Sequence, residues 1–283
     1  MSRASTPAPR PRFTALVLAG SRGPEDPVAS SRGLAHKCLV EAGGVAMLQR
    51  VVEALRASDC IGRIGVALGD VTVLAELPGI AALVEDGDVV PLSCTESPAA
   101  TVVQAIDRLD DPFPLLVTTA DHPLLTPEMV DYFCTEAVAG GGDVAVALAP
   151  ASAVLDRYPG ALRTFLGFRD ERYSGCNLFA LMRPQAARAA TYWRRFESQR
   201  KRPWRLAKLF GVMSLALYLC RLLTLEAAMR RVSRQFGLAV KAVVMPFAEA
   251  AIDVDKPADL ALVNDILRAR DTAHGDAPAS NPR

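Results

Sequence analysis

The 283-residue sequence has few of the patterns that mark disulfide-rich, metal-binding or membrane-spanning proteins. Its six cysteines are scattered and never stand as a C-x-x-C pair, which argues against a disulfide framework or a structural zinc site and favours a reducing compartment. Its three histidines, His36, His122 and His274, show no spacing typical of metal ligands. The apolar run from 209 to 220 has twelve residues, which is too short to span a bilayer.

The sequence also lacks an excess of either charge, because 32 Lys and Arg stand against 31 Asp and Glu. Taken alone, the net charge of +1 suggests no polyanionic partner. This average hides a segment from 183 to 241 with 14 basic and 2 acidic residues, a net of +12, whereas the remainder has 18 against 29, a net of −11. Such a split suggests a surface-binding segment.

Within this segment, residues 194–221 combine a basic stretch with the apolar run that follows it. The composition is typical of an interfacial helix, and Trp204 suits the headgroup boundary of a membrane. We therefore predict peripheral membrane contact for 194–221. The alternative is an ordinary core helix with a solvated basic flank. Nucleic acid is not expected as a partner, because aromatic side chains are not interleaved among the charges.

Length and composition are those of a globular chain that forms one large domain or two small ones. Apolar residues make up 51% and charged residues 22%, enough to bury a sizeable core. Residues 1–12 are rich in Pro, Ala and Arg and show no apolar centre of a secretory signal. We predict a folded domain over 13–270, with a basic helical insert at 183–236 and disordered tails at 1–12 and 271–283.

Short apolar segments alternate with segments of helical periodicity, as in parallel βαβ units. The predicted strands are 13–19, 61–68, 81–84, 114–120, 143–149, 177–182 and 238–245. The predicted helices are 45–56, 71–77, 99–109, 127–139, most of 184–235, and 257–270. The pattern predicts an open α/β sheet, in which ligands bind beyond the carboxyl ends of the strands.

The first of these strands ends abruptly in the sequence Gly-Ser-Arg-Gly at 20–23. Glycine allows a tight turn and a close approach to a ligand, and successive N–H groups of such a loop can bind one anion. Arg22 and Lys37 add positive charge, so this stretch predicts a site for phosphates. Its spacing matches neither the Walker A loop nor the G-x-G-x-x-G fingerprint.

Leu18-Ala19-Gly20-Ser21-Arg22, with Lys37 further on, resembles the signature L-A-G-x-R…K of nucleotidyltransferases with the MobA-like fold. Two later stretches resemble the same family in order and separation: 119–125 its metal-binding Asp-x-Pro strand end, and 251–260 its C-terminal acidic segment. The resemblance implies a GT-A-type, Rossmann-like, mostly parallel sheet flanked by helices. The loop 21–35 is longer than the family's, and Gly23-Pro24 departs from the usual Gly-x-Arg-Met.

Three aspartates are the predicted metal ligands. Asp121 follows a buried strand, where a carboxylate could bind Mg²⁺, an ion that prefers oxygen ligands and retains substrate phosphates; the alternative is a turn or helix cap. Asp253 and Asp255 stand two apart, so an extended chain places both on one face. The resemblance places ligands in this segment without deciding between them. Asp253 is favoured, since Asp255 could simply cap the helix that begins near 257.

Lys37 matches the lysine with which the family contacts nucleotide phosphate, and Arg22 would assist it. The alternative for Lys37 is an exposed loop lysine. The backbone of the phosphate loop is expected to hold the leaving pyrophosphate through the residues Ala19, Gly20, Ser21 and Gly23.

The remaining candidates line the two substrates. Ser97 and Thr101 lie where the family reads the base. Gly175 and Asn177 resemble a segment that lines the acceptor side, although a plain turn would also explain them. Cys176 is expected to be a buried or loop thiol rather than a nucleophile, because no histidine stands near it in sequence.

The sequence thus predicts a Mg²⁺-dependent nucleotidyltransferase that moves a nucleoside monophosphate from an NTP, with CTP or GTP favoured, to a small phosphorylated acceptor. One alternative is a glycosyltransferase of the same fold that uses a nucleotide sugar and releases a nucleoside diphosphate instead of pyrophosphate. Another is a non-catalytic, membrane-associated nucleotide-binding protein. The expected location is the cytoplasm, with contact to the inner face of the membrane.

Overall fold

The computed structural model describes residues 12–20, 25–197 and 217–275. Within these ranges the strands are β1 (Phe13–Leu18), β2 (Glu41–Ala42), β3 (Val45–Ala46), β4 (Ile61–Leu68), β5 (Val89–Ser93), β6 (Leu115–Thr119), β7 (Val144–Pro150), β8 (Leu166–Gly167), β9 (Arg172–Leu181) and β10 (Val240–Val244). The α-helices are α1 (Pro27–Ser30), α2 (Met47–Arg56), α3 (Pro78–Glu85), α4 (Pro98–Arg108), α5 (Pro127–Ala139), α6 (Ala151–Arg157), α7 (Ala187–Glu197), α10 (Leu225–Phe236) and α11 (Pro257–Gly275). Short 3₁₀ helices cover Lys37–Leu39, Val71–Glu76, Pro184–Ala186 and Ala248–Ala251.

In the described part of the chain, eight strands form one mixed sheet in the order β10-β7-β9-β6-β1-β4-β5, with β8 paired to β9. β1 is parallel to β4 and β6, and only β9 runs antiparallel to its neighbours β6, β7 and β8. The mostly parallel α/β sheet predicted from the sequence is therefore confirmed. The chain passes from β1 to β4 on one side and later returns to β6 on the other, so the order of the strands reverses between β1 and β6. Ligand sites of open α/β sheets lie at such a reversal.

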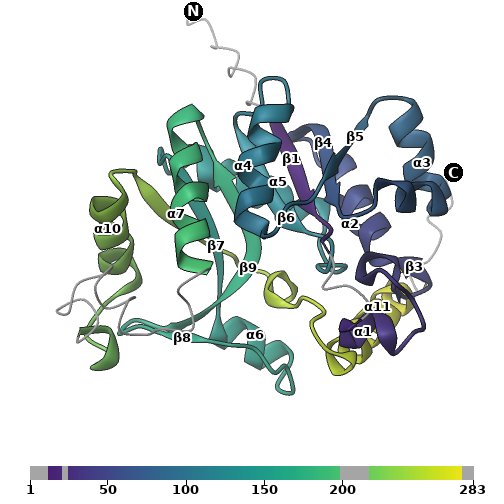
Figure 1. Ribbon diagram of the computed structural model, residues 1–283. Helices are drawn as coiled ribbons and strands as arrows, with labels where there is room; N and C mark the ends of the chain where they lie inside the picture. The colour runs from purple at the N-terminus through teal and green to yellow at the C-terminus, as the bar shows by residue number, and fades with distance from the viewer. Residues whose placement is uncertain (1–11, 21–24, 198–216, 276–283) are drawn as a thin grey trace, which may run out of the picture.

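Helices cover both faces of the sheet, and α4, α7 and α10 lie together on the face nearer the viewer in Figure 1. Strand β1 shows why both faces are covered, because its side chains alternate between two hydrophobic clusters. Ala15 and Val17 join the cluster that includes α2 and α5, whereas Leu16 and Leu18 join the cluster that includes α4 and α7. A strand that is buried on both faces is expected to be almost entirely apolar, and in β1 Thr14 is the one polar residue.

Helix α11 packs away from the sheet, against α1 and the β2–β3 hairpin (Figure 1). Its apolar residues Leu260, Val263 and Leu267 share a third cluster with Val28 of α1 and Met47 of α2. This packing brings the segment that precedes α11 to the carboxyl end of β6, although the two are far apart in sequence. α11 continues to Gly275, five residues beyond its predicted end at 270.

One predicted strand was wrong. Residues 81–84 belong to α3, which begins at Pro78, and the strand that follows is β5. Proline at the first helical position is a start signal that the short apolar run at 81–84 obscured. β5 contains Pro91, which is tolerated because β5 pairs with β4 alone and lies at the edge of the sheet.

Smaller differences have local causes. The predicted helix 45–56 begins at Met47, because Val45 and Ala46 pair with β2 across a turn in which Gly43 and Gly44 both have positive φ. The predicted helix 71–77 is a 3₁₀ helix, and the predicted strand 177–182 begins earlier, at Arg172.

The predicted basic insert 183–236 contains α7 and α10, both packed on the same sheet face, while residues 198–216 lie outside the described ranges. Most of the predicted membrane segment 194–221 therefore also lies outside them, as do the tail residues 1–11 and 276–283. Among the helices that are described, none is both long enough and apolar enough to cross a membrane.

Candidate functional site

The carboxyl ends of β1 and β6 form the floor of the site. Ala120 donates its N–H to the carbonyl of Leu18 over 3.0 Å, and Ala19 donates to the carbonyl of Ala67 over 2.7 Å. Gly20 is exposed directly beyond this point. The predicted phosphate-loop residues Ser21, Arg22 and Gly23 fall in 21–24, outside the described residues, so their roles stay predictions.

One ammonium group joins two distant parts of the chain at this floor. Lys37, which opens a 3₁₀ helix, places its Nζ 2.6 Å from Oδ2 of Asp121 and 3.4 Å from Oδ1 of Asp255. The lysine side chain is mostly buried, whereas that of Asp255 is exposed. The structure thus brings together three residues that the sequence singled out, and Lys37 is not an exposed loop lysine.

Asp121 keeps one oxygen unused. Its Oδ1 is buried and has no hydrogen-bond partner among the described residues, while Oδ2 contacts Lys37. A buried carboxylate oxygen without a partner is costly unless a ligand binds it. Its backbone carbonyl accepts the N–H of Val254 over 2.9 Å, which ties β6 to the acidic segment 253–255.

Asp253 has partners at both carboxylate oxygens. Asn177 donates its Nδ2 to Oδ2 over 2.6 Å, and Arg163 forms an ion pair with Oδ1. Arg163 also donates to the backbone carbonyl of Asp253 over 3.1 Å and lies 3.8 Å from a carboxylate oxygen of Asp259. These contacts anchor the acidic segment and leave Asp255, rather than Asp253, with an oxygen facing Lys37.

Asp259 caps the segment before α11. Its Oδ2 accepts the backbone N–H groups of Asp255 and Lys256 over 3.0 and 2.8 Å. Asp259 thus ties the residues before α11 to the first turn of that helix, and the carboxylate of Asp255, for which a cap was the alternative role, pairs with Lys37 instead.

Two of these residues, Arg163 and Asp259, were missed by reasoning from the sequence. Arg163 stands in a loop after α6 that carries no recognisable spacing, and its partner Asp253 is 90 residues away. Asp259 did carry a signal, because an acidic residue in the first turn of a helix often accepts backbone N–H groups.

Ser97 and Thr101 lie at the amino end of α4 and use their hydroxyls locally. Ser97 caps α4 by accepting the N–H of Ala100 over 3.2 Å. Thr101 is buried, accepts the N–H of Thr95 over 3.0 Å and donates to the carbonyl of Ser97 over 3.0 Å. These bonds explain both residues as part of the α4 cap, and no described contact joins them to Lys37 or Asp121.

On the acceptor side, β9 presents Gly175 and Asn177. Gly175 is exposed, and a Cβ added there would meet no atom within 4 Å, so its surroundings are open to a ligand. Asn177 has a φ of 51°, which is uncommon for a residue other than glycine. Between them, Cys176 is the buried thiol expected from the sequence, and this burial raises its pKa to about 12.

His122, next to Asp121, is buried with its Nε2 3.4 Å from the carbonyl oxygen of Glu249. Burial lowers the pKa of the imidazole to about 4, so the ring is neutral near neutral pH. Glu249 also accepts the hydroxyl of Tyr158 over 2.5 Å. These contacts give His122 a structural role beneath the site.

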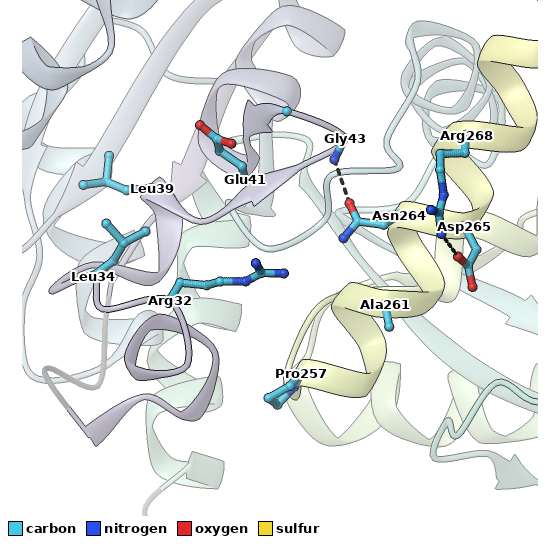
Figure 2. Close-up of a pocket in the computed structure, with 11 residues that line it drawn as sticks. Arg32, Leu34, Leu39, Glu41, Gly43, Pro257, Ala261, Asn264, Asp265 and Arg268 are labelled. Carbon is cyan, nitrogen blue, oxygen red and sulfur yellow. Dashed lines mark hydrogen bonds and ion pairs between the residues drawn. The ribbon is translucent and has the colours of Figure 1, made fainter.

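A pocket of about 750 Å³ lies beside Lys37 and Asp255, between residues 32–44 and α11 (Figure 2). Leu39, in the same 3₁₀ helix as Lys37, lies on one wall, and Pro257, two residues after Asp255, lies on the other. Arg32 extends between the two walls in Figure 2. At its rim, Gly43 donates its N–H to Asn264 over 2.7 Å.

The carboxylates of the site could hold a Mg²⁺ ion only if a bound phosphate and water supplied the remaining ligands. The described residues contain no group of three or more His, Cys, Asp or Glu arranged to hold a metal. Mg²⁺ usually takes one or two protein carboxylates and completes its shell with phosphates and water. Oδ1 of Asp121 and the exposed carboxylate of Asp255 meet that requirement, whereas Asp253 is already paired.

Comparison with known families gives one match, a model described as the MobA-like NTP transferase domain, over residues 15–204. This span contains Lys37, Asp121 and Asn177 and ends before the acidic segment 253–255. A comparison with curated proteins gives no match.

Solved structures of similar fold cover nearly the whole chain. A hypothetical transferase from Thermus thermophilus has a TM-score of 0.75 and 29% identity, over 88% of this chain and 99% of that one. A 4-diphosphocytidyl-2C-methyl-D-erythritol synthase from Anaerococcus prevotii has a TM-score of 0.53 and 13% identity, over 91% and 96%. A CMP:2-keto-3-deoxy-manno-octonic acid synthetase complexed with CTP has a TM-score of 0.53 and 15% identity, over 92% and 99%. The last two show the fold alone.

Proposed function

The chain belongs to the family of MobA-like NTP transferases and is a nucleotidyltransferase, and we propose that it transfers a nucleoside monophosphate from an NTP to a small phosphorylated acceptor, with Mg²⁺ and release of pyrophosphate. The observation that carries this proposal is the contact of one Lys37 ammonium with Asp121 and Asp255 at the reversal point of the sheet. A cation beside a carboxylate with an unused oxygen is suited to a metal-bound triphosphate.

In the proposed reaction, an acceptor phosphate oxygen forms a bond to the α-phosphorus of the NTP. The bond from that phosphorus to the oxygen bridging the β-phosphate breaks, and pyrophosphate leaves with the electron pair. A phosphate acceptor is already ionised near neutral pH, so the step requires no general base. The protein contributes alignment and fixed charge rather than a covalent intermediate.

Each residue of the site has a proposed task. Asp121 and Asp255 would hold Mg²⁺, which when bound offsets the charge of the triphosphate and polarises the α-phosphate. Lys37 supplies a fixed positive charge beside the phosphates, and Arg22 would add a second. Asn177 is oriented by its bond to Asp253, which leaves its side-chain carbonyl available to an acceptor hydroxyl.

For the donor we propose CTP or GTP. The support for CTP is the fold shared with two proteins whose names refer to cytidine nucleotides. For the location we propose the cytoplasm, because none of the six cysteines, all of them among the described residues, forms a disulfide, as is usual in a reducing compartment.

The test measures products with each of the four NTPs, Mg²⁺ and a panel of sugar and alcohol phosphates. The proposal expects pyrophosphate in step with a nucleotidylated acceptor, and at least a 100-fold lower rate for Asp121→Asn. Asp156→Asn, an exposed aspartate on α6, is the matched control. Release of a nucleoside diphosphate from a nucleotide sugar would instead support a glycosyltransferase and contradict the proposal.

A further inference from the structure

Large apolar side chains that face solvent are concentrated at one end of the described molecule. Of the seven found among the described residues, four are leucines on two short segments: Leu162 at 83% exposure, Leu166 at 46%, Leu219 at 70% and Leu222 at 59%. Single exposed apolar residues are common on protein surfaces, but a group of them marks an interaction site.

The two segments, 162–169 and 217–223, lie side by side. Arg169 donates its backbone N–H to the carbonyl of Leu223 over 2.9 Å, and the rings of Phe168 and Tyr218 meet edge to face with centroids 5.8 Å apart. In Figure 1, β8 and the segment before α10 occupy the same end of the molecule, at the lower left. Leu166, Leu219 and Leu222 therefore form one surface, called here the leucine edge.

Three arginines lie in or next to the two segments of the leucine edge. Arg169 and Arg221 are exposed within the two segments, and Arg172 lies over the ring of Phe165 at 5.7 Å. The two acidic residues of the turn between β8 and β9 are both used by backbone groups: Asp170 accepts the N–H of Leu225 over 3.1 Å, and Glu171 accepts that of Arg172 over 2.7 Å. In the sequence, 194–208 carries seven basic residues and one acidic residue, and 198–208 of this stretch lie outside the described residues.

We infer that the leucine edge binds the surface of an anionic lipid bilayer. Leucine side chains enter the boundary between headgroups and acyl chains, while arginines remain with the headgroup phosphates. Arg169, Arg172 and Arg221, which lie in or next to the two segments, are the feature that favours an anionic membrane over an apolar protein partner.

The first of the two segments begins next to a residue of the candidate site. Leu162, the most exposed of the four leucines, precedes Arg163, which pairs with Asp253. The inference requires no particular reaction, so membrane binding and nucleotidyl transfer are tested separately.

The experiment is co-sedimentation of the full chain with vesicles of phosphatidylcholine, with and without phosphatidylglycerol, at low and high salt. The wild type is expected to sediment with the anionic vesicles at low salt and to be released at high salt. The triple variant Leu166→Ser, Leu219→Ser and Leu222→Ser is expected to bind at least tenfold more weakly. The control variant Val71→Ser with Val138→Ser changes two exposed valines elsewhere and is expected to bind like the wild type.

Circular dichroism and pyrophosphate release without vesicles establish that the triple variant is folded and active. Wild-type protein that remains in the supernatant with anionic vesicles would overturn the inference, as would a triple variant that binds them unchanged. A dimer that the triple variant loses, seen by gel filtration without any vesicle binding, would also overturn it and would assign the edge to self-association.

Discussion

The ammonium group of Lys37 forms ion pairs with two carboxylates, those of Asp121 and Asp255, which are far apart in the sequence. If Lys37 is replaced by Met, Asp121 and Asp255 become neighbouring negative charges with no cation between them, and the triphosphate meets a more repulsive site. We expect a loss of 100-fold or more in the rate of pyrophosphate release, together with weaker NTP binding. Lys256→Met, an exposed lysine beside Asp255, is the control and should retain the wild-type rate. A wild-type rate for both variants would show that Lys37 has no part in the reaction.

Cys38 predicts how stability depends on alkaline pH. Burial raises the pKa of its thiol from about 9 to about 11. Between these values the unfolded chain loses the proton and the folded chain keeps it, so the free energy of unfolding falls as pH rises, by up to about 3 kcal/mol for this group. Urea titrations from pH 8 to 11 should therefore show a smaller decline for Cys38→Ala than for the wild type. Equal declines would contradict the assignment.

The residues of the site differ in how far the sequence could predict them. Asp121 and Lys37 follow motifs next to a strand that periodicity identifies, so their meeting could be expected. Arg163 could not be, because its role depends on a contact with Asp253 across the fold and its own loop has no distinctive pattern. With Asp253 held by Arg163, it is Asp255 that faces Lys37, although reasoning from the sequence favoured Asp253 as the metal ligand.

The segment before α11 depends on its cap. Asp259→Ala removes the acceptor for two backbone N–H groups and a neighbour of Arg163. We expect a loss of about 1 kcal/mol in stability, or a melting temperature lower by about 2–4 °C. Activity should fall as well, because Asp255 loses its fixed position.

A matched variant on the same helix is Asp265→Ala, which removes an exposed pair with Arg268. An exposed ion pair of this kind contributes little, so its melting temperature should change by less than about 1 °C. Thermal unfolding of both variants checks the prediction, and a larger effect at Asp265 would contradict it.

Secondary structure was predictable where a start and a stop signal agreed. α5 has both, with Thr126 as a cap, Pro127 at the first position and Gly140 at the end, and its predicted bounds match the structure. The predicted strand 81–84 was wrong because proline has a different role at each end of this region: Pro78 begins the helix α3, whereas Pro91 lies in the edge strand β5. Only the neighbours in the sheet distinguish them.

At the scale of the whole molecule, the site exists because the strand order reverses between β1 and β6. Parallel strands place their carboxyl ends at one edge, and α11 closes that edge by packing on α1 and the β2–β3 hairpin. The sequence predicts such an edge, but the partners brought to it by α11 follow from tertiary packing. The leucine edge is likewise assembled from two segments, 162–169 and 217–223, that only the fold brings together.

We propose that Asp121, Lys37 and Asp255 together bind an NTP with Mg²⁺. The most direct test measures the melting temperature with CTP, GTP, ATP and UTP, each with and without Mg²⁺, for the wild type, Asp121→Asn and the control Asp156→Asn. A ligand at 100 times its dissociation constant stabilises the folded state by about 3 kcal/mol, so we expect the melting temperature to rise by several degrees with one or more NTPs. The rise should require Mg²⁺ and be lost in Asp121→Asn alone. No rise with any NTP, or an equal rise in Asp121→Asn, would show that these residues do not bind an NTP with Mg²⁺.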